Sequence, residues 1–360
     1  MKQKVLIFVL DSVGGAERMT TLIGKELIAQ SYDVTFCLIK RTTQSSITDF
    51  IPKQINKEYI YSKNGLRCLL SMLKVISKER PSYVFSSIYS LNTKLLLIRF
   101  LFPKTKFIIR CDNYLYTYSS KQRRLLSVTY SKADIIIAQT EEMRDELVAQ
   151  VGIDFSKVFV LHNPIDTKTI QDKLSESTNP YPNNGKKHVV AVGRFSYQKG
   201  FDMLIDAFVK IRKQHSNIDL YIVGDYTIMD EIIYKELTSK IVKEGLQHDL
   251  HCVGYKDNPY TYIKYANCFV LSSRWEGLPN ALIESLYLGT PVAAFKCIPI
   301  IERIVNDGVD GCLAEKDDIN SLSGAILGAL KMDRIKMSYY PTDISRFVEL
   351  FNFKVGKSRQ

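Results

Sequence analysis

Short apolar runs alternate with longer amphipathic stretches along the chain, and this alternation predicts a fold. Short runs that are β-branched or continuously apolar are typical of buried strands. In the first half they lie at Val5–Leu10, Asp33–Ile39, Tyr83–Ser87, Lys106–Arg110, Asp134–Ala138 and Val158–Leu161. Between them, apolar residues at helical spacing predict helices at 16–29, 66–79, 121–131 and 141–150.

The second half repeats this alternation. Strands are predicted at His188–Val192, Asp219–Val223, His251–Val253, Cys268–Leu271 and Pro291–Phe295, and helices at 200–212, 229–244, 280–288 and 319–331. Alternation of strands and helices is typical of a parallel sheet with helices on both faces. The expected fold class is therefore α/β, with two Rossmann-like, doubly wound parallel-sheet domains that face a central cleft.

A length of 360 residues is too great for one ordinary core and suits two α/β domains. Between the halves, Asn163-Pro164 is followed by a polar segment at 175–185 that is rich in turn-forming residues. We predict an N-terminal domain at 1–163 and a C-terminal domain at 164–340. The remaining residues, 341–360, are expected to form a last helix, within 343–351, and a tail that pack back on the N-terminal domain.

Charge is divided unevenly between the halves. Residues 1–163 hold 24 Lys and Arg against 14 Asp and Glu, a net charge of +10, whereas residues 164–360 hold 25 against 24, a net charge of +1. Much of the excess lies at 53–80 and 99–132. A solvated basic face, nucleic acid and an anionic membrane all remain open as explanations. No nucleic-acid module is recognisable, whereas each cation near an anionic leaflet contributes about 1 kcal/mol, so an anionic membrane surface is the expected partner.

The composition indicates a folded protein of a reducing compartment. Apolar residues make up 46% of the chain and charged residues 24%, as in ordinary globular domains. The seven cysteines are scattered and form no Cys-x-x-Cys pair, which favours reduced thiols. The first apolar run is too short for a signal-peptide core, and Arg99 interrupts the longest apolar stretch, at 95–102. We therefore expect a cytoplasmic protein whose membrane contact is peripheral, at the inner face of the cytoplasmic membrane.

Candidate chemistry lies just after the strands, because doubly wound sheets bind ligands at the carboxyl ends of their strands. After the first strand, Gly14 and Gly15 open a helix whose free N–H groups favour a phosphate, although a tight structural turn explains them equally well. The pattern Gly-x-Gly-x-x-Gly is absent, and the second strand ends at Ile39-Lys40-Arg41 without an acid that would bind a ribose. These two observations exclude a dinucleotide-dependent oxidoreductase.

Two cations and two glutamates follow strands of the second half. Arg194 and Lys199 come after the strand at 188–192, and cations in a dry site stabilise the charge that develops on a departing diphosphate, with solvated surface cations as the alternative. Glu276 lies in the loop Trp275-Glu276-Gly277-Leu278-Pro279-Asn280. Glu284 lies about one turn into the helix that Pro279 or Asn280 starts, where it can accept hydrogen bonds from two vicinal hydroxyls.

These motifs resemble those of the retaining glycosyltransferases of family 4, or glycosyl transferases group 1, which have the GT-B fold. The resemblance covers nearly the whole chain. It rests on the Glu-x(7)-Glu spacing of Glu276 and Glu284, on Gly193-Arg194 with Lys199-Gly200, on Gly14-Gly15 and on Asn163-Pro164.

The resemblance implies a role for each matching residue. Arg194 and Lys199 would bind the donor diphosphate, Glu284 the ribose and Glu276 the donor sugar, and the segment at Val253 would lie beside the base. No metal and no cofactor are implied besides the nucleotide-sugar co-substrate, which is expected to be UDP-linked. The predicted catalytic residues are Glu276, Arg194 and Lys199; the predicted donor site comprises Gly14, Gly15, Gly193, Arg194, Lys199, Val253, Glu276, Gly277, Leu278 and Glu284.

Three departures from the family pattern concern the sugar and the acceptor. Many relatives carry a histidine where this chain has Ile109-Arg110-Cys111-Asp112-Asn113, so Arg110 and Asn113 are candidate acceptor or sugar contacts, as in a subgroup with Arg and Asn there. The usual Gly-Asp-Gly-Pro turn is Gly224-Asp225-Tyr226-Thr227, and the usual glycine-rich loop is replaced at 297–301. The residues for the diphosphate and the ribose are intact.

The expected function is transfer of a hexose or N-acetylhexosamine, with retention and without a metal, from a nucleotide-diphosphate sugar to a saccharide acceptor. The family resemblance suggests a bacterial capsule, O-antigen or exopolysaccharide pathway, with a free or polyprenyl-diphosphate-linked acceptor. The alternative is a catalytically weak partner subunit with the same fold that organises an assembly at a membrane. The altered loop at 297–301 keeps this alternative open.

Overall fold

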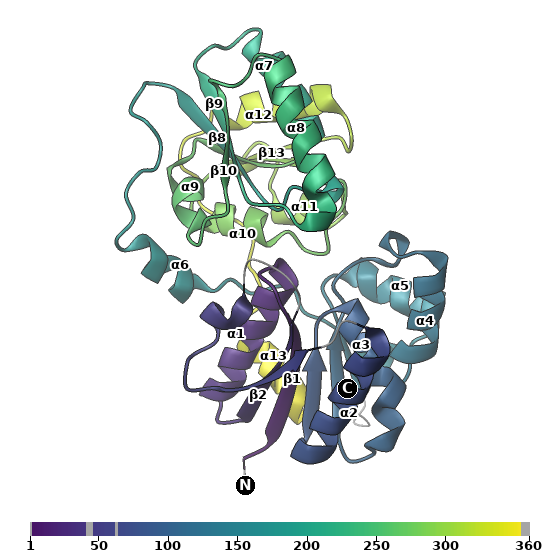
Figure 1. Ribbon diagram of the computed structural model, residues 1–360. Coiled ribbons are helices and arrows are strands. Elements are labelled where there is room, and N and C mark those ends of the chain that lie inside the picture. The colour runs from purple at the N-terminus through teal and green to yellow at the C-terminus, as the bar shows by residue number, and fades with distance from the viewer. Residues whose placement is uncertain (1, 41–45, 62–63, 354–360) are drawn as a thin grey trace. The chain divides into compact units, whose positions relative to one another are not determined.

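The chain forms two compact units, each built on its own parallel sheet (Figure 1). Unit 1 comprises Met1–Pro164 with Pro341–Gln360, and unit 2 comprises Ile165–Tyr340. The computed structural model describes residues 2–40, 46–61 and 64–353. Arg41, Lys63 of the basic segment at 53–80, and residues 354–360 of the predicted tail lie outside these described residues.

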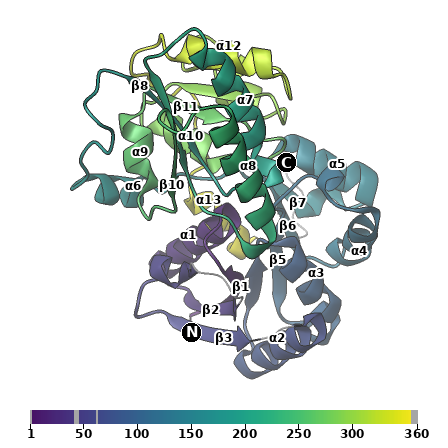
Figure 2. The same cartoon turned by 45° about the horizontal axis from the view of Figure 1, so that its top comes forward.

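Unit 1 is a seven-stranded sheet in the order β3-β2-β1-β4-β5-β6-β7, with every neighbouring pair parallel. Its strands are β1 (Lys4–Asp11), β2 (Asp33–Lys40), β3 (Asn56–Tyr61), β4 (Tyr83–Ser86), β5 (Lys106–Arg110), β6 (Ile135–Ala138) and β7 (Val158–Val160). Its α-helices are α1 (Gly15–Ala29), α2 (Gly65–Glu79), α3 (Tyr89–Ile98), α4 (Ser120–Tyr130), α5 (Glu141–Val151) and α13 (Ser345–Asn352), and the short 3₁₀ helix η2 (Arg99–Leu101) continues α3. Figure 2 shows α2, α3 and α4 as neighbours within this unit.

Unit 2 is a six-stranded parallel sheet in the order β10-β9-β8-β11-β12-β13. Its strands are β8 (Lys187–Val192), β9 (Ile218–Val223), β10 (Leu250–Gly254), β11 (Cys268–Leu271), β12 (Val292–Phe295) and β13 (Gly311–Ala314). Its α-helices are α6 (Thr167–Leu174), α7 (Phe201–Arg212), α8 (Glu231–Lys243), α9 (Pro259–Tyr265), α10 (Asn280–Tyr287), α11 (Ile301–Ile304) and α12 (Ile319–Ala329). The strand order reverses at β8 and β11, which is where doubly wound sheets bind ligands.

Each strand and helix that the sequence predicts is present, with ends that differ by a few residues at most. The prediction missed β3, β13 and several helices. Strand β3 lies at the sheet edge with half of its residues exposed, and its first half is polar, so it has no continuous apolar run to reveal it. Helix α3 is apolar on most sides and buries Leu91, Leu95, Leu96 and Ile98, so it has no amphipathic period to detect.

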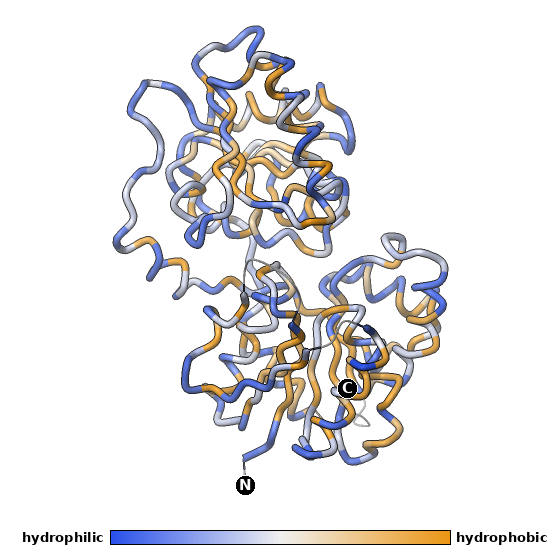
Figure 3. Tube along the Cα trace, in the orientation of Figure 1, coloured by the Kyte–Doolittle hydropathy of each residue, from blue (hydrophilic) through white to orange (hydrophobic). Residues whose placement is uncertain are grey.

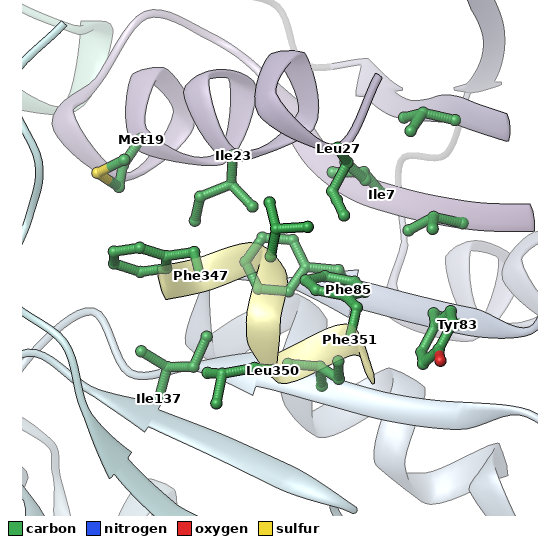
Figure 4. Packing of buried hydrophobic residues seen from close by; sticks show 14 of the residues in the cluster. Ile7, Met19, Ile23, Leu27, Tyr83, Phe85, Ile137, Phe347, Leu350 and Phe351 are labelled. Atoms are coloured by element: carbon green, nitrogen blue, oxygen red, sulfur yellow. The ribbon is translucent and has the colours of Figure 1, made fainter. Parts of the chain in front are cut away.

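The core of unit 1 joins segments from both ends of the chain. Figure 3 shows strongly hydrophobic residues along the strands of this sheet. Over one face, Phe347 and Phe351 of α13 pack among Ile23 and Leu27 of α1 and Phe85 of β4, and all five side chains are fully buried (Figure 4). The helix predicted within 343–351 is therefore an integral part of the unit 1 core.

Candidate active site

Three loops meet backbone to backbone at the carboxyl edge of the unit 2 sheet. Gly193, just after β8, donates its N–H to the carbonyl oxygen of Val223 at 3.0 Å. A Cβ on Gly224, just after β9, would lie 1.8 Å from the carbonyl oxygen of Gly193. A Cβ on Gly200 would lie 2.1 Å from the carbonyl oxygen of Ser272, just after β11. Because only glycine permits such approaches, these positions fix how closely the loops converge.

The convergence brings Lys199 and Glu276 together. The Lys199 ammonium donates to Oε1 of Glu276 at 2.7 Å, and the Ser273 hydroxyl donates to the same oxygen at 2.6 Å. Glu276 is only 6% exposed, so its carboxylate is held in one orientation and its charge is compensated. Burial, together with the charge of Glu276, raises the pKa of the nearby Cys297 thiol.

A second ion pair joins the β11–α10 loop to the first turn of α7, which directly follows the loop that carries Lys199. Arg274 forms a bidentate pair with Asp202 at 2.9 and 2.6 Å, and its guanidinium lies 3.9 Å from the ring centroid of Tyr197. The side-chain amide of Gln198 donates to the carbonyl oxygen of Trp275 at 3.0 Å. Burial by itself would raise the pKa of Asp202, but the hydrogen bond and charge of Arg274 hold that pKa below its usual value. We call the pair of Arg274 and Asp202 the loop clamp.

The other predicted donor residues of unit 2 lie on neighbouring segments. Arg194 is 56% exposed at its side chain, and its Nε lies 3.6 Å from a carboxylate oxygen of Asp230. Glu284 lies in α10, where its Oε1 accepts a hydrogen bond from the buried Tyr260 hydroxyl at 3.4 Å. Gly277 and Leu278 are buried in the β11–α10 loop, and Val253 lies in β10.

Sequence reasoning missed three side chains that position this site. Ser273 precedes Glu276 by three residues in the same loop, so a local signal existed for it. Tyr260 and the Asp202 end of the loop clamp are 24 and 72 residues from their partners. Contacts over such separations leave no local pattern in one sequence.

The glycines of unit 1 lie where the sequence places them, and an acid accompanies them. Gly14 is the N-cap of α1, and Gly15 is its first residue. A Cβ on Gly14 would lie 2.4 Å from a carboxylate oxygen of Glu17, whose other oxygen accepts a hydrogen bond from the Ser12 hydroxyl at 2.9 Å. The carboxylate of Glu17 thus already lies beside the N-terminus of α1, where it interacts favourably with the helix dipole.

Arg110, the candidate acceptor contact, is almost fully buried in unit 1. It is 1% exposed, and its Nη2 donates to Oδ1 of Asn163. Burial lowers the pKa of Arg110 to about 10. Contact with an acceptor would require this side chain to become accessible, so its predicted role stays a prediction. Asn113 lies in the half-buried loop after β5.

Family models match both parts of the chain. The model of Glycosyltransferase Family 4 matches residues 13–169, and that of Glycosyl transferases group 1 matches residues 173–341. This chain belongs to the family 4, group 1 glycosyltransferases. Known members of the family supply further comparisons.

Three relatives resemble this glycosyltransferase in sequence. An uncharacterized glycosyltransferase of Methanocaldococcus jannaschii is 29% identical over 64% of this chain and 60% of its own length. An amylovoran biosynthesis glycosyltransferase of Erwinia amylovora is 26% identical over 85% of this chain and 84% of its own length. The N-acetylgalactosamine-N,N'-diacetylbacillosaminyl-diphospho-undecaprenol 4-alpha-N-acetylgalactosaminyltransferase of Campylobacter jejuni is 26% identical over 72% of this chain and 67% of its own length.

A solved structure agrees with the fold of the glycosyltransferase. The crystal structure of Anabaena HepE in complex with UDP and glucose matches with a TM-score of 0.76, over 91% of this chain and 90% of that chain, at 16% identity. At this identity the similarity concerns the fold. It confirms the predicted GT-B class of two Rossmann-like domains.

Proposed function

We propose that this glycosyltransferase transfers a hexose or N-acetylhexosamine from a UDP-sugar to a saccharide acceptor, with retention of configuration and without a metal. The observation that carries the proposal is the pair of the half-buried Lys199 and the buried Glu276 at the carboxyl edge of the unit 2 sheet, with Glu284 on the following helix. HepE, which shares the fold, was crystallised with UDP and glucose. In the described residues, no cluster of three His, Cys, Asp or Glu side chains is arranged to hold a metal ion.

Each side chain has a defined task in this proposal. An ammonium group has three N–H donors, and Lys199 uses one of them on Glu276, so the others are available to diphosphate oxygens. Arg194, on the exposed side of the same loop, adds a second cation. Together they stabilise the charge that the diphosphate gains as its bond to the sugar breaks. Glu284 accepts hydrogen bonds from the ribose hydroxyls, and Glu276 orients the sugar.

We further propose that the acceptor is a saccharide linked to polyprenyl diphosphate, in bacterial capsule, O-antigen or exopolysaccharide synthesis. The Campylobacter relative is named for a diphospho-undecaprenol acceptor and the Erwinia relative for amylovoran biosynthesis, and these names support the proposal. A lipid-linked acceptor requires the enzyme to work at a membrane surface. The proposed location is the cytoplasm, with peripheral attachment to the inner face of the cytoplasmic membrane.

The test is release of nucleoside diphosphate, and sugar transfer, from a panel of UDP-sugars with and without lipid-linked acceptors. We expect activity with wild type and a loss of about tenfold or more in kcat/KM for Arg194→Ala and for Glu284→Ala, since each removes charge-assisted hydrogen bonds. Glu236→Ala, which removes an exposed glutamate of α8, is the matched control and retains activity.

The same reactions test the finer parts of the proposal. The anomeric coupling constant of the product reports retention, and activity that persists in EDTA reports independence from metal ions. Wild type and variants that are equally inactive across all donors and acceptors would instead favour the partner subunit.

A further inference from the structure

The helices α2, α3 and α4 of unit 1 have an unusually one-sided charge. Helix α2 holds three Lys and Arg residues, α3 with η2 holds two, and α4 holds three, which makes eight against one acidic residue, Glu79. In contrast, the first half of α5 holds four acidic residues. The positive excess of the first half of the chain is thus concentrated in three consecutive helical segments.

These helices also expose large apolar side chains. Seven of them are between 37% and 71% exposed: Leu66, Leu70, Leu97, Phe100, Leu101, Leu125 and Val128. Single exposed apolar residues are ordinary on protein surfaces, but a gathering of them marks an interaction surface. A merely solvated basic face does not account for leucines, valine and phenylalanine in the same place.

Helix α3 contacts both α2 and α4, and each of the three segments exposes part of this apolar set to solvent. The Tyr89 hydroxyl at the start of α3 donates to the carbonyl oxygen of Gln122 in α4 at 3.1 Å. A Cβ on Gly65 at the start of α2 would lie 3.7 Å from Cε of Lys94 in α3. Both views of the ribbon show the same neighbours (Figure 1, Figure 2). We call the exposed side of α2, α3 with η2, and α4 the α2–α4 face.

Unit 2 also exposes apolar side chains, near the start of α8, but without a positive excess around them. Ile228 and Met229, just before α8, are 81% and 92% exposed, more than any residue of the α2–α4 face, and Ile232 in α8 is as exposed as Phe100. The charges around them are mixed, because Glu231 pairs with Lys235 along the same helix. Both units therefore expose apolar residues. Among the described residues, the α2–α4 face is where such residues occur together with a large positive excess.

We infer that the α2–α4 face docks on the surface of an anionic lipid bilayer. Its leucine, valine and phenylalanine side chains enter the boundary between headgroups and acyl chains. Exposed cations such as Lys121, Arg123 and Arg124 contact lipid phosphates, whereas Arg99 and Lys78 already pair with carboxylates. Sequence-tolerant binding of single-stranded nucleic acid relies on stacking by aromatic side chains, whereas this face is mainly aliphatic. No helix in the described part of the chain is long and apolar enough to cross a membrane. The inference rests on the proposed membrane-linked acceptor for its purpose, but bilayer binding itself needs no sugar chemistry.

The experiment measures binding of the full chain to vesicles of phosphatidylcholine alone or mixed with phosphatidylglycerol, at low and high salt. We expect binding only to the anionic vesicles, and weakening with salt, because the attraction is screened. Lys121→Gln with Arg124→Gln should weaken binding about 30-fold, from the usual contribution of each cation near an anionic surface. Leu66→Ser with Leu70→Ser should weaken it about tenfold or more by removing apolar insertion.

Matched controls come from unit 2. Ile228→Ser with Met229→Ser removes two exposed apolar side chains, and Lys213→Gln with Lys243→Gln removes two exposed cations. Both controls should bind vesicles like wild type. The inference would be overturned if the control pairs lost as much vesicle binding as the α2–α4 variants, or if the α2–α4 variants bound vesicles like wild type. It would also be overturned if the protein bound a single-stranded RNA as tightly as vesicles and the leucine substitutions left that RNA binding unchanged.

A soluble saccharide acceptor separates this inference from the proposed function. Variants of the α2–α4 face should retain UDP affinity and transfer to the soluble acceptor while they lose vesicle binding. Failure of transfer by wild type would count against the function but not against the docking surface.

Discussion

At the scale of single residues, steric space decides the shape of the candidate active site as much as charge does. Lys199 and Glu276 can pair only because Gly200 lets the loop after β8 approach the carbonyl oxygen of Ser272. Gly200 also has a φ of 61°, a left-handed conformation that costs other residues about 1 kcal/mol. Both constraints act at one position next to the predicted diphosphate ligand.

Gly200→Ala therefore tests whether this close approach supports donor binding. We expect a lower melting temperature and UDP affinity reduced about tenfold or more, because the added methyl group separates the two loops. Gly245→Ala is the matched control, since Gly245 has a φ of 68° and a Cβ there would meet no other atom within 4 Å. The control should lose stability only. Calorimetry measures UDP affinity and thermal unfolding measures stability for both variants. Equal UDP affinities for Gly200→Ala and Gly245→Ala would show that the close approach at Gly200 does not support donor binding.

At the scale of structural elements, the loop clamp joins the loop after β11 to the start of α7, next to the loop after β8. Arg274 and Asp202 form two parallel hydrogen bonds, a geometry that fixes both distance and orientation. The clamp holds the loop that carries Lys199 against the loop that carries Glu276. Its expected contribution is to the position of these side chains, with about 1 kcal/mol of stability from a partly exposed pair.

Variants of the loop clamp should weaken donor binding more than their small loss of folding stability would explain. We expect Asp202→Asn and Arg274→Lys each to weaken UDP binding about fivefold, and the double variant to be no worse than either single one, because the two residues act as a unit.

A second bidentate pair in unit 1 provides the control for the loop clamp. Arg99 and Asp134 form hydrogen bonds of 3.1 and 3.0 Å. Asp134→Asn should lower the melting temperature and leave UDP affinity unchanged. Additive losses in the double variant of the clamp, or the same loss of affinity in Asp134→Asn, would show that the clamp does not position the site.

At the scale of the whole molecule, unit 1 is completed by a helix from the opposite end of the chain. Phe347 and Phe351 of α13 are fully buried in the core beside α1 and β4 (Figure 4). The Tyr32 hydroxyl also donates to the side-chain oxygen of Asn352 at 2.8 Å. Residues 1–164 alone would expose the apolar surface that α13 covers.

Phe351→Ala should therefore destabilise unit 1 by about 3–5 kcal/mol, the usual cost of removing a buried phenylalanine side chain. Phe155→Ala is the matched control, because Phe155 is 57% exposed in the same unit, and it should cost less than about 1 kcal/mol. Denaturant unfolding followed by circular dichroism measures both. Similar midpoints for the two variants would mean that α13 is not part of the cooperative core.

The hydrophobic pattern determined most elements of the fold, because parallel strands that are buried on both faces must be apolar. Strands β1, β5 and β11 lie within a residue or so of their predicted ends. The hydrophobic pattern did not predict β3 or α3, whose burial differs from that of a half-buried strand or helix. Strand β3 is exposed at an edge, and α3 is buried on most sides, so neither has the half-buried periodicity on which prediction depends.

The sequence by itself also predicts which side chains would meet a ligand, since Arg194, Lys199, Glu276 and Glu284 follow strands whose carboxyl ends share one sheet edge. Only the tertiary structure showed that Lys199 and Glu276 form a pair, that Ser273 and Tyr260 hold the two glutamates, and that Arg110 is buried. The reason is physical. Strand order and side-chain type follow from local hydrophobicity, whereas these contacts join residues that are distant in the chain and depend on how closely the backbones pack.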